Sequence, residues 1–271
     1  MPNDYSQTLP LVIGHRGASA LAPENTLIAF ETALPDGAAG IELDVRLARD
    51  GVPVVIHDST LRRTGLREEA VASLASSELG QIDVGSWFNR AYPQKARADY
   101  SRQFVSTLDQ VFDLLSKRHI RSKIAYVEMK TDNAEDTSLE LARSVVQSIK
   151  RHHLQSQVVV VSFNLRAVAH IKTVESFITT GASFEPLRHP LKIFRGQPIV
   201  TDALECGASQ ILLHRLVATR CLLELAAENQ LRPVIWTVDD PRWVRRRASF
   251  SIYAVITNNP GEMTRAIAGN D

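Results

Sequence analysis

The sequence has few cysteines and no long hydrophobic run. Cys206 and Cys221 are its only cysteines in 271 residues and show no CxxC spacing, so neither a disulfide framework nor a cysteine-based zinc site is predicted. No apolar run approaches the ~20 residues that a membrane-spanning helix needs. The N-terminal MPNDYSQTLP also lacks the basic and apolar regions of a signal peptide. We therefore expect a soluble cytoplasmic protein without a stable membrane anchor.

An excess of charge of one sign is also missing. The formal net charge is +1, which argues against a dedicated nucleic-acid or membrane-binding surface. Arg245-Arg246-Arg247 is the only dense basic run, and we interpret it as a solvated helix face after Pro241. A hydrophobic content of 44% and a charged content of 23% are ordinary for a globular protein. We expect one domain over residues 1–271, and the sequence does not predict its oligomeric state.

Short apolar runs alternate with helical patterns along the chain. The runs cover residues 11–15, 40–45, 124–130, 158–163, 177–184, 209–214, 233–238 and 253–257. Most are continuous, which is typical of strands covered on both faces. Between them lie helical patterns such as Leu108, Val111, Phe112 and Leu115, spaced i, i+3, i+4, i+7. This order predicts an α/β fold, a (β/α)8 TIM barrel, with a doubly wound open sheet as the alternative.

Two departures from this rhythm follow the second run. Residues 59–106 contain turn residues and aromatics but no clear strand, and we interpret them as a short irregular insertion over the barrel mouth. Before them, Asp50-Gly51 is a strong signal for a two-residue hairpin turn. Folding about these two residues pairs positions whose numbers sum to 101 and places Asp44 opposite His57. A solvent-exposed edge hairpin is the alternative, but VPVVI is too apolar to favour it.

Polar residues occupy the ends of the first three runs, where a parallel barrel collects its functional groups. They are His15 and Arg16, then Glu42 and Asp44, then Glu128 and Lys130, with His57 joining them through the hairpin. Because side chains alternate along a strand, residues two apart face the same side. The first three strands therefore bring carboxylates, cations and imidazoles together.

These residue types favour one kind of chemistry. Three carboxylates without cysteine make a hard oxygen site, which prefers Mg²⁺ or Ca²⁺ to zinc. One such divalent cation, with Arg16 and Lys130, would exceed the three negative charges by about one unit, which suits a phosphodiester monoanion. Two histidines with near-neutral pKa values could exchange protons across that substrate. The pattern favours a phosphodiesterase.

The motifs HRGASALAPENTLIAFETAL, GIELDVRLARDGVPVVIHDSTLRRTG and VEMK resemble the glycerophosphodiester phosphodiesterase family. The likeness is dense over residues 13–65, continues at 77–88 and 106–115, and is looser at 161–164, 234–240 and 255–260. It implies a (β/α)8 barrel that uses a divalent metal to hydrolyse glycerophosphodiesters to glycerol 3-phosphate and an alcohol. In the family, the nucleophile is thought to be the adjacent glycerol hydroxyl, which gives a cyclic phosphate that water then opens.

The resemblance also implies roles for single residues. Carried over by position, Glu42, Asp44 and Glu128 resemble the metal ligands. His15 and His57 resemble the acid–base pair, with His57 as acid and His15 as base, although the sequence itself leaves these two roles open. Arg16 and Lys130 resemble the phosphate contacts. The family's Glu-Asn-Thr signature falls on residues 24–26 and is expected to brace the His15 loop, with Asn25 or Thr26 capping the next helix.

Three positions depart from the family pattern. They are Ala48-Arg49 before Asp50-Gly51, the run Arg63-Thr64-Gly65, and Asn258, where an aspartate is common. None of them removes a metal or proton-transfer residue. They therefore concern substrate preference and leave the predicted chemistry unchanged.

The other polar and aromatic strand ends allow more than one interpretation. Trp236 is expected either as a platform for the glycerol end of the substrate or as barrel core. Ser162 and Phe163 are candidates for the pocket border, with Phe163 assigned rather to the core, and His214 is interpreted as a structural histidine.

Competing functions also stay open at this stage. They are a Schiff-base aldolase using Lys130, a non-catalytic barrel that binds a phosphate ligand, and a lysophospholipase D with an acyl groove in residues 59–106.

Overall fold

The computed structural model describes residues 9–35, 37–117, 123–131, 135–186, 196–247 and 250–269. The strands are β1 Leu11–Gly14, β2 Gly40–Leu47, β3 Pro53–Val55, β4 Ile124–Met129, β5 Val158–Ser162, β6 Thr179–Phe184, β7 Gln210–His214, β8 Arg232–Trp236 and β9 Ala254–Thr257. The α-helices are α1 Leu27–Ala33, α2 Ser76–Leu79, α3 Ser86–Ala91, α4 Leu108–Leu115, α5 Glu135–Arg151, α6 Leu165–Val174, α7 Gln197–Glu205, α8 Arg220–Glu228, α9 Pro241–Arg245 and α10 Pro260–Ile267. The 3₁₀ helices are η1 Val71–Ser73, η2 Pro93–Lys95 and η3 Tyr100–Arg102. None of these helices combines the length and apolar character needed to span a bilayer.

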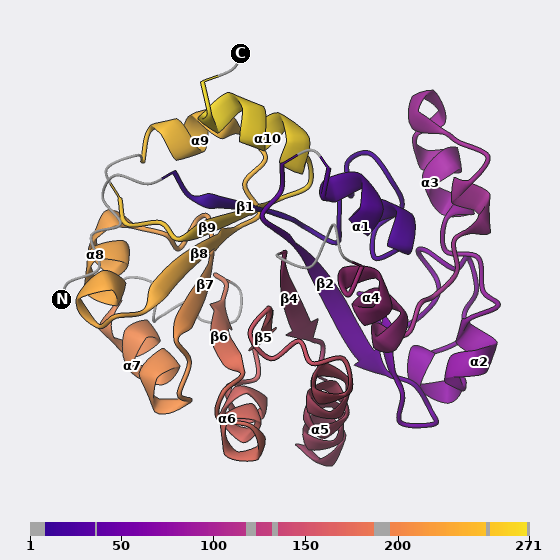
Figure 1. The fold of residues 1–271 in the computed structure, drawn as a ribbon, viewed down its shortest axis with the longest axis horizontal. Helices are drawn as coiled ribbons and strands as arrows, with labels where there is room; N and C mark the ends of the chain where they lie inside the picture. The colour runs from indigo at the N-terminus through magenta and orange to yellow at the C-terminus, as the bar shows by residue number, and fades with distance from the viewer. Residues whose placement is uncertain are drawn as a thin grey trace.

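The parallel strands close into a ring. β1 pairs in parallel with both β2 and β9, and the remaining neighbours β2, β4, β5, β6, β7, β8 and β9 pair in chain order. The helices between the strands surround this ring, as Figure 1 shows. An open sheet has two free edges and this ring has none, so the predicted (β/α)8 barrel is confirmed and the doubly wound alternative is wrong.

Strand alternation decides which side chains reach the inside of the barrel. In β2, the side chains of Ile41, Leu43 and Val45 pack in the layer between strands and helices. Because successive side chains point to opposite faces, Glu42 and Asp44 face the barrel interior. The barrel interior also contains an apolar cluster around Tyr126, whose hydroxyl donates to Gln210 Oε1 at 2.9 Å. The carboxylates thus share the interior with a packed apolar core.

The β2–β3 hairpin forms in a register one residue away from the predicted one. Val45 pairs with Val55, so paired numbers sum to 100. The reason is a three-residue loop in place of the predicted two-residue turn: Ala48 N–H donates to the Val52 carbonyl at 3.0 Å, and Gly51 has φ +77°. Ile56 N–H, not His57, therefore bonds the Asp44 carbonyl, at 3.0 Å. His57 lies beyond the end of β3, where strand alternation no longer constrains its direction.

Residues 59–106 contain no strand, as predicted, and fold into α2, α3 and the 3₁₀ helices. One part of this excursion packs with Val54 and Ile56 in a small apolar cluster. Another part brings Phe88 and Tyr100 against Ala22 and Ala29. In Figure 1, α2 and α3 lie on the side of the barrel next to α1 and α4. The excursion therefore supports the β2–β3 hairpin and the segment between β1 and α1.

Candidate active site

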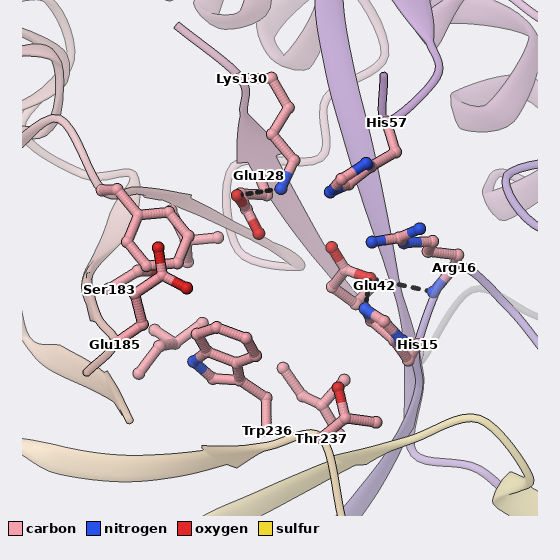
Figure 2. Close-up of a pocket in the computed structure, with 14 residues that line it drawn as sticks. His15, Arg16, Glu42, His57, Glu128, Lys130, Ser183, Glu185, Trp236 and Thr237 are labelled. Carbon is pink, nitrogen blue, oxygen red and sulfur yellow. Dashed lines mark hydrogen bonds and ion pairs between the residues drawn. The ribbon is translucent and has the colours of Figure 1, made fainter. Parts of the chain in front are cut away.

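A cavity of about 410 Å³ lies among the C-terminal ends of the parallel strands. Figure 2 shows the side chains that line it. Seven of the eight predicted site residues are among them: His15, Arg16, Glu42, His57, Glu128, Lys130 and Trp236. The eighth, Asp44, is buried beside them and lies 3.0 Å from the Lys130 Nζ. Sequence reasoning from strand ends thus brought together residues that the fold does place in one region.

The three carboxylates form a compact group. Glu42, Asp44 and Glu128 each present an oxygen, and these oxygens lie within 4.8 Å of one another. Asp44 and Glu128 are direct neighbours in the β2–β4 ladder, and Glu42 is two residues before Asp44 on the same face. Burial raises the pKa of Glu42 well above its usual value, and the neighbouring carboxylates of Asp44 and Glu128 raise it further. Such a group can accept a cation.

Two cations lie against this group. The Lys130 Nζ donates to Glu128 Oε1 and lies 3.0 Å from Asp44 Oδ1, while Arg16 Nε lies 3.1 Å from Asp44 Oδ2. Burial alone would lower the pKa of Lys130, but the carboxylates of Asp44 and Glu128 raise it above its usual range. Burial alone would raise the pKa of Asp44, but Lys130 and Arg16 hold it below its usual range. Both cations and Asp44 are therefore charged at neutral pH.

The loop after β1 has a backbone that favours glycine. Arg16 and Gly17 both have positive φ, at +54° and +81°. A Cβ on Gly17 would lie 2.5 Å from the Ala29 carbonyl carbon, so no larger residue fits against α1. This turn directs the Arg16 backbone N–H to Glu42 Oε2 at 2.9 Å. The sequence His15-Arg16-Gly17 thus ties the first strand end to the carboxylate group.

The Glu24-Asn25-Thr26 signature braces this loop, as expected: Glu24 accepts from the Arg16 guanidinium at 2.7 Å, and the Asn25 N–H donates to the Arg16 carbonyl at 3.1 Å. The Asn25 side chain donates to Asp44 Oδ2 at 2.8 Å and accepts from the Asp44 N–H at 3.1 Å. Thr26, rather than Asn25, caps α1, because its hydroxyl accepts from Ala29 N–H at 3.3 Å. Asn25 therefore orients a carboxylate, and Thr26 supplies the helix cap.

His15 has an amide as its hydrogen-bond partner. Its Nδ1 lies 2.7 Å from Asn258 Oδ1, and the Asn258 side-chain amide donates to Asp239 Oδ2 at 2.7 Å. Because Asp239 takes the NH₂ group, the Asn258 oxygen faces His15, so the Nδ1 of a neutral His15 carries the hydrogen. Burial, followed by the charge of Arg16, lowers the pKa of His15 to about 4. His15 is therefore neutral at pH 7, with Nε2 as an acceptor.

His57 has a carboxylate as its partner instead. Its Nδ1 lies 2.7 Å from Asp58 Oδ1, and its side chain is partly exposed to the cavity. Burial lowers the pKa of His57, and the charge of Asp44 opposes that shift. The hydrogen bond with Asp58 also favours the protonated form, but the charges of Lys130 and Arg16 act with burial, and the pKa stays below its ordinary value. The two histidines thus differ in their partners, which no local sequence pattern had distinguished.

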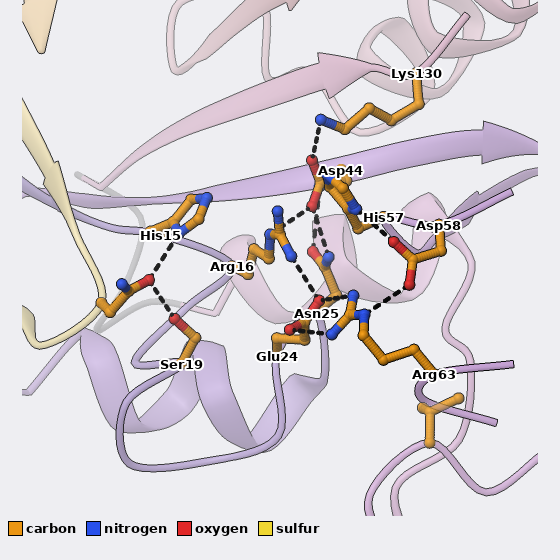
Figure 3. A network of polar contacts seen from close by, with 12 residues as sticks. His15, Arg16, Ser19, Glu24, Asn25, Asp44, His57, Asp58, Arg63 and Lys130 are labelled. Atoms are coloured by element: carbon orange, nitrogen blue, oxygen red, sulfur yellow. Dashed lines mark hydrogen bonds and ion pairs between the residues drawn. The ribbon is translucent and has the colours of Figure 1, made fainter. Parts of the chain in front are cut away.

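Sequence reasoning missed two groups of residues. The first is the set of ion pairs that Arg63 makes with Glu24 and Asp58, which requires knowing how the 59–106 excursion folds back (Figure 3). The second is Ser183 and Glu185, which line the cavity from the end of β6. The strand-end rule could have found Glu185, because it directly follows the predicted strand FITTGASF.

The other strand-end residues are placed as follows. Trp236 fits both interpretations, since it lines the cavity and packs on the barrel interior. The assignment of Ser162 and Phe163 is reversed: Phe163 lines the cavity, whereas Ser162 is buried and donates to the Met129 carbonyl at 2.9 Å. His214 packs edge-on against Trp236 with ring centroids 5.1 Å apart, and its Nδ1 accepts from Leu216 N–H at 3.3 Å, in agreement with a structural role.

A barrel with carboxylates, cations and histidines around one cavity at its strand ends defines the class of protein: a (β/α)8 barrel with the features of an enzyme for an anionic substrate. Comparison with known proteins narrows this class. The model of the glycerophosphoryl diester phosphodiesterase family matches residues 15–262. The chain therefore belongs to this family of phosphoric diester hydrolases.

Individual relatives agree with that assignment. The chain is 33% identical over 261 residues to the glycerophosphodiester phosphodiesterase of Bacillus subtilis, covering 92% of this chain and 84% of that protein. A solved structure from Silicibacter pomeroyi is similar with a TM-score of 0.86 and 25% identity, covering 97% and 94% of the two chains. An Oleispira antarctica phosphodiesterase, solved in complex with the product sn-glycerol-3-phosphate, shares the fold with a TM-score of 0.81 and 24% identity over 96% and 97% of the chains.

Proposed function

We propose that this protein is a metal-dependent glycerophosphodiester phosphodiesterase that releases glycerol 3-phosphate and an alcohol, with His15 and His57 transferring the protons. Membership of the family and the Bacillus subtilis relative support the activity. The product in the Oleispira antarctica structure supports the identity of the product here. The observation that carries the proposal is the arrangement of three carboxylates, two cations and two histidines around one cavity.

Glu42, Asp44 and Glu128 are the residues that would hold one divalent cation, Mg²⁺ or Ca²⁺. Their oxygens are close enough to share an ion, and all three are the hard donors that these ions prefer. Glu42 Oε1 is buried and finds no hydrogen-bond partner among the described residues, which suits a ligand atom. Such an ion supplies neutralisation of phosphate charge and makes a neighbouring hydroxyl more acidic.

Arg16 and Lys130 are the proposed contacts for the phosphate. Both line the cavity, and both stay cationic because the neighbouring carboxylates raise their pKa values against the effect of burial. Trp236 offers an apolar surface for the glycerol end of the substrate on another wall of the same cavity. The substrate would then lie with its phosphate between the histidines.

His15 suits the role of base. With Nδ1 committed to Asn258, its Nε2, which lies 4.0 Å from Glu42 Oε2, would take the proton from the glycerol hydroxyl that attacks the phosphorus atom. That attack would form a cyclic phosphate and break the bond to the alcohol. His57, whose Nδ1 faces Asp58, suits the role of the acid that protonates the leaving alkoxide. Water would then open the cyclic phosphate, with the two histidines in reversed roles.

The competing functions have less support. A Schiff-base enzyme needs a neutral lysine, whereas Lys130 lies between two carboxylates that stabilise its ammonium form. A lysophospholipase D with an acyl groove in the excursion is not supported, because no residue of 59–106 lines the cavity. A cytoplasmic location remains our proposal, since Cys206 and Cys221 form no disulfide.

The substrate class can be tested by product analysis. Purified protein with Mg²⁺ is incubated with glycerophosphocholine, glycerophosphoethanolamine, glycerophosphoglycerol and lysophosphatidylcholine, and glycerol 3-phosphate is followed by a coupled assay. We expect release from the three deacylated diesters and little turnover of the lysolipid. Turnover of the lysolipid alone would favour a lysophospholipase D, and ligand binding without turnover of any substrate would favour a binding protein.

A further inference from the structure

We propose that Arg63, a residue of the excursion, is a positioning residue that holds His57 and Arg16 in their working geometry at the same time. The inference rests on the proposed function, because it assigns Arg63 a role in that reaction. Figure 3 shows the network that carries it.

Arg63 uses its whole guanidinium group in this network. Its two terminal nitrogens donate to the two oxygens of Glu24, at 2.7 and 2.8 Å, and its Nε donates to Asp58 Oδ2 at 2.7 Å. The group also lies 5.7 Å from the centre of the Trp87 ring, within the range of a cation–π contact. Only a planar, forked donor can bind two carboxylates in this way, so lysine is not equivalent here.

Each of the two carboxylates holds a different site residue. Asp58 presents its other oxygen to His57 Nδ1 at 2.7 Å. Glu24 Oε1 accepts from the Arg16 guanidinium at 2.7 Å, and the same oxygen accepts from Nη2 of Arg63. Arg63 therefore joins the proposed acid and the proposed phosphate contact through one residue on each side.

Burial and charge explain why the link matters. The Glu24 side chain is only 12% exposed, and burial alone would raise its pKa, but the hydrogen bonds from Arg63 help to keep that pKa low. Without Arg63, the carboxylate of Asp58 loses its cationic partner and is free to rotate away from His57. The Arg63 side chain is itself 41% exposed, so a small cation from solution can reach its place.

The central test uses Arg63→Ala with two diesters of glycerol 3-phosphate that differ in their leaving group. Choline leaves as an alkoxide and needs the acid, whereas 4-nitrophenol leaves without protonation. Loss of a positioning contact of this kind lowers activity by about 10–100-fold. We expect kcat for the choline ester to fall by about that factor, kcat for the nitrophenyl ester to fall much less, and KM to rise for both because Arg16 is displaced.

Two further variants separate the branches. Asp58→Asn should lower kcat for the choline ester with little change in KM, and Glu24→Gln should raise KM for both esters. The matched control is Arg62→Ala, because Arg62 is the adjacent arginine and is exposed, and it forms an ion pair with the exposed Glu68. Arg62→Ala should behave as wild type. Added guanidinium ions at millimolar concentration should partly restore Arg63→Ala and leave the other variants unchanged.

The outcomes distinguish the two levels of the proposal. Equal losses with both esters in a variant that melts at a lower temperature, without rescue by guanidinium, would reduce Arg63 to a structural residue and overturn the inference. Wild-type kinetics in Arg63→Ala would overturn it as well, while the proposed function would stand. A wild-type protein that cleaves neither ester would overturn the proposed function and this inference together.

Discussion

At the scale of single residues, the site contains carboxylates that are buried away from water, which is unfavourable for their charged form. Glu42 and Asp44 are 3% and 1% exposed, and Glu128 adds a third carboxylate within reach. Lys130 and Arg16 compensate for part of this charge. Burial is the largest cause of the raised pKa values of Glu42 and Glu128. The remaining repulsion among the carboxylates raises these pKa values further. A bound cation would remove that repulsion. The thermal stability of the protein should therefore report whether a metal ion is bound.

The first prediction concerns Glu42→Gln. An acid whose pKa is higher in the folded than in the unfolded state reduces stability as the pH rises through the range between those values, so the charge of Glu42 is destabilising at pH 7. Without metal, Glu42→Gln should therefore melt above wild type, by roughly 2–4 °C for each kcal/mol gained. With Mg²⁺, wild type should gain stability and the variant should not. The exposed Glu228→Gln serves as control, and a lower melting temperature for Glu42→Gln in EDTA would contradict the prediction.

The second prediction concerns the pH dependence of the base. His15 must be unprotonated to act as a base, and burial with the charge of Arg16 lowers its pKa to about 4. The base therefore stays active as the pH falls below the ordinary histidine value, and the acid limb of kcat/KM should lie well below pH 6.5 at saturating metal. A pH–rate profile with glycerophosphocholine provides the measurement. An acid limb at or above that ordinary value would show that His15 is not the base.

At the scale of elements, the β2–β3 hairpin shows where sequence reasoning meets its limit. The sequence predicted the hairpin correctly because Asp50-Gly51 lies between two apolar runs. It could not predict the register, because Gly51 with positive φ serves a two-residue turn and a three-residue loop equally well. His57 reaches the cavity in spite of the shift, because β3 ends at Val55 and the following backbone is no longer held in a ladder.

The third prediction tests this loop. A Cβ on Gly51 would meet only Glu140 Oε1, at 3.2 Å, and the end of that long side chain can move aside, so the effect of a substitution comes mainly from the positive φ. Gly51→Ala should lower the free energy of unfolding by about 1–2 kcal/mol, and Gly51→Asn by less, because asparagine tolerates this conformation. Urea denaturation of both variants gives the comparison. Equal stability of Gly51→Ala and wild type would mean that the loop does not hold this conformation in solution.

At the scale of the whole molecule, the order of strands and helices was enough to predict the barrel. Continuous apolar strands, covered on both faces, leave few arrangements, and strand ends in a barrel meet at one mouth. For that reason His15, Glu42, Glu128 and Lys130 could be placed together from sequence. That residues 1–271 form a single domain stays a prediction.

The contacts of the 59–106 excursion could not be predicted in the same way. It has no periodic pattern, and its position depends on packing of Phe88 and Tyr100 against residues far away in the sequence. Arg63 was noted only as part of a departure from the family pattern, and its partners emerge from the fold. The strand-end rule can therefore predict the residues that line the cavity. It cannot predict the residues of the excursion, such as Arg63, that position those residues.

One measurement tests the central claim most directly. The rate of glycerol 3-phosphate release from glycerophosphocholine is measured with EDTA-treated protein, before and after addition of Mg²⁺ or Ca²⁺, for wild type and His57→Ala. We expect no release without metal, recovery when metal is added, and a loss of about 10²–10⁴-fold in His57→Ala under the same conditions. Release that persists in EDTA, or that is unchanged in His57→Ala, would contradict a metal-dependent reaction with His57 as the acid.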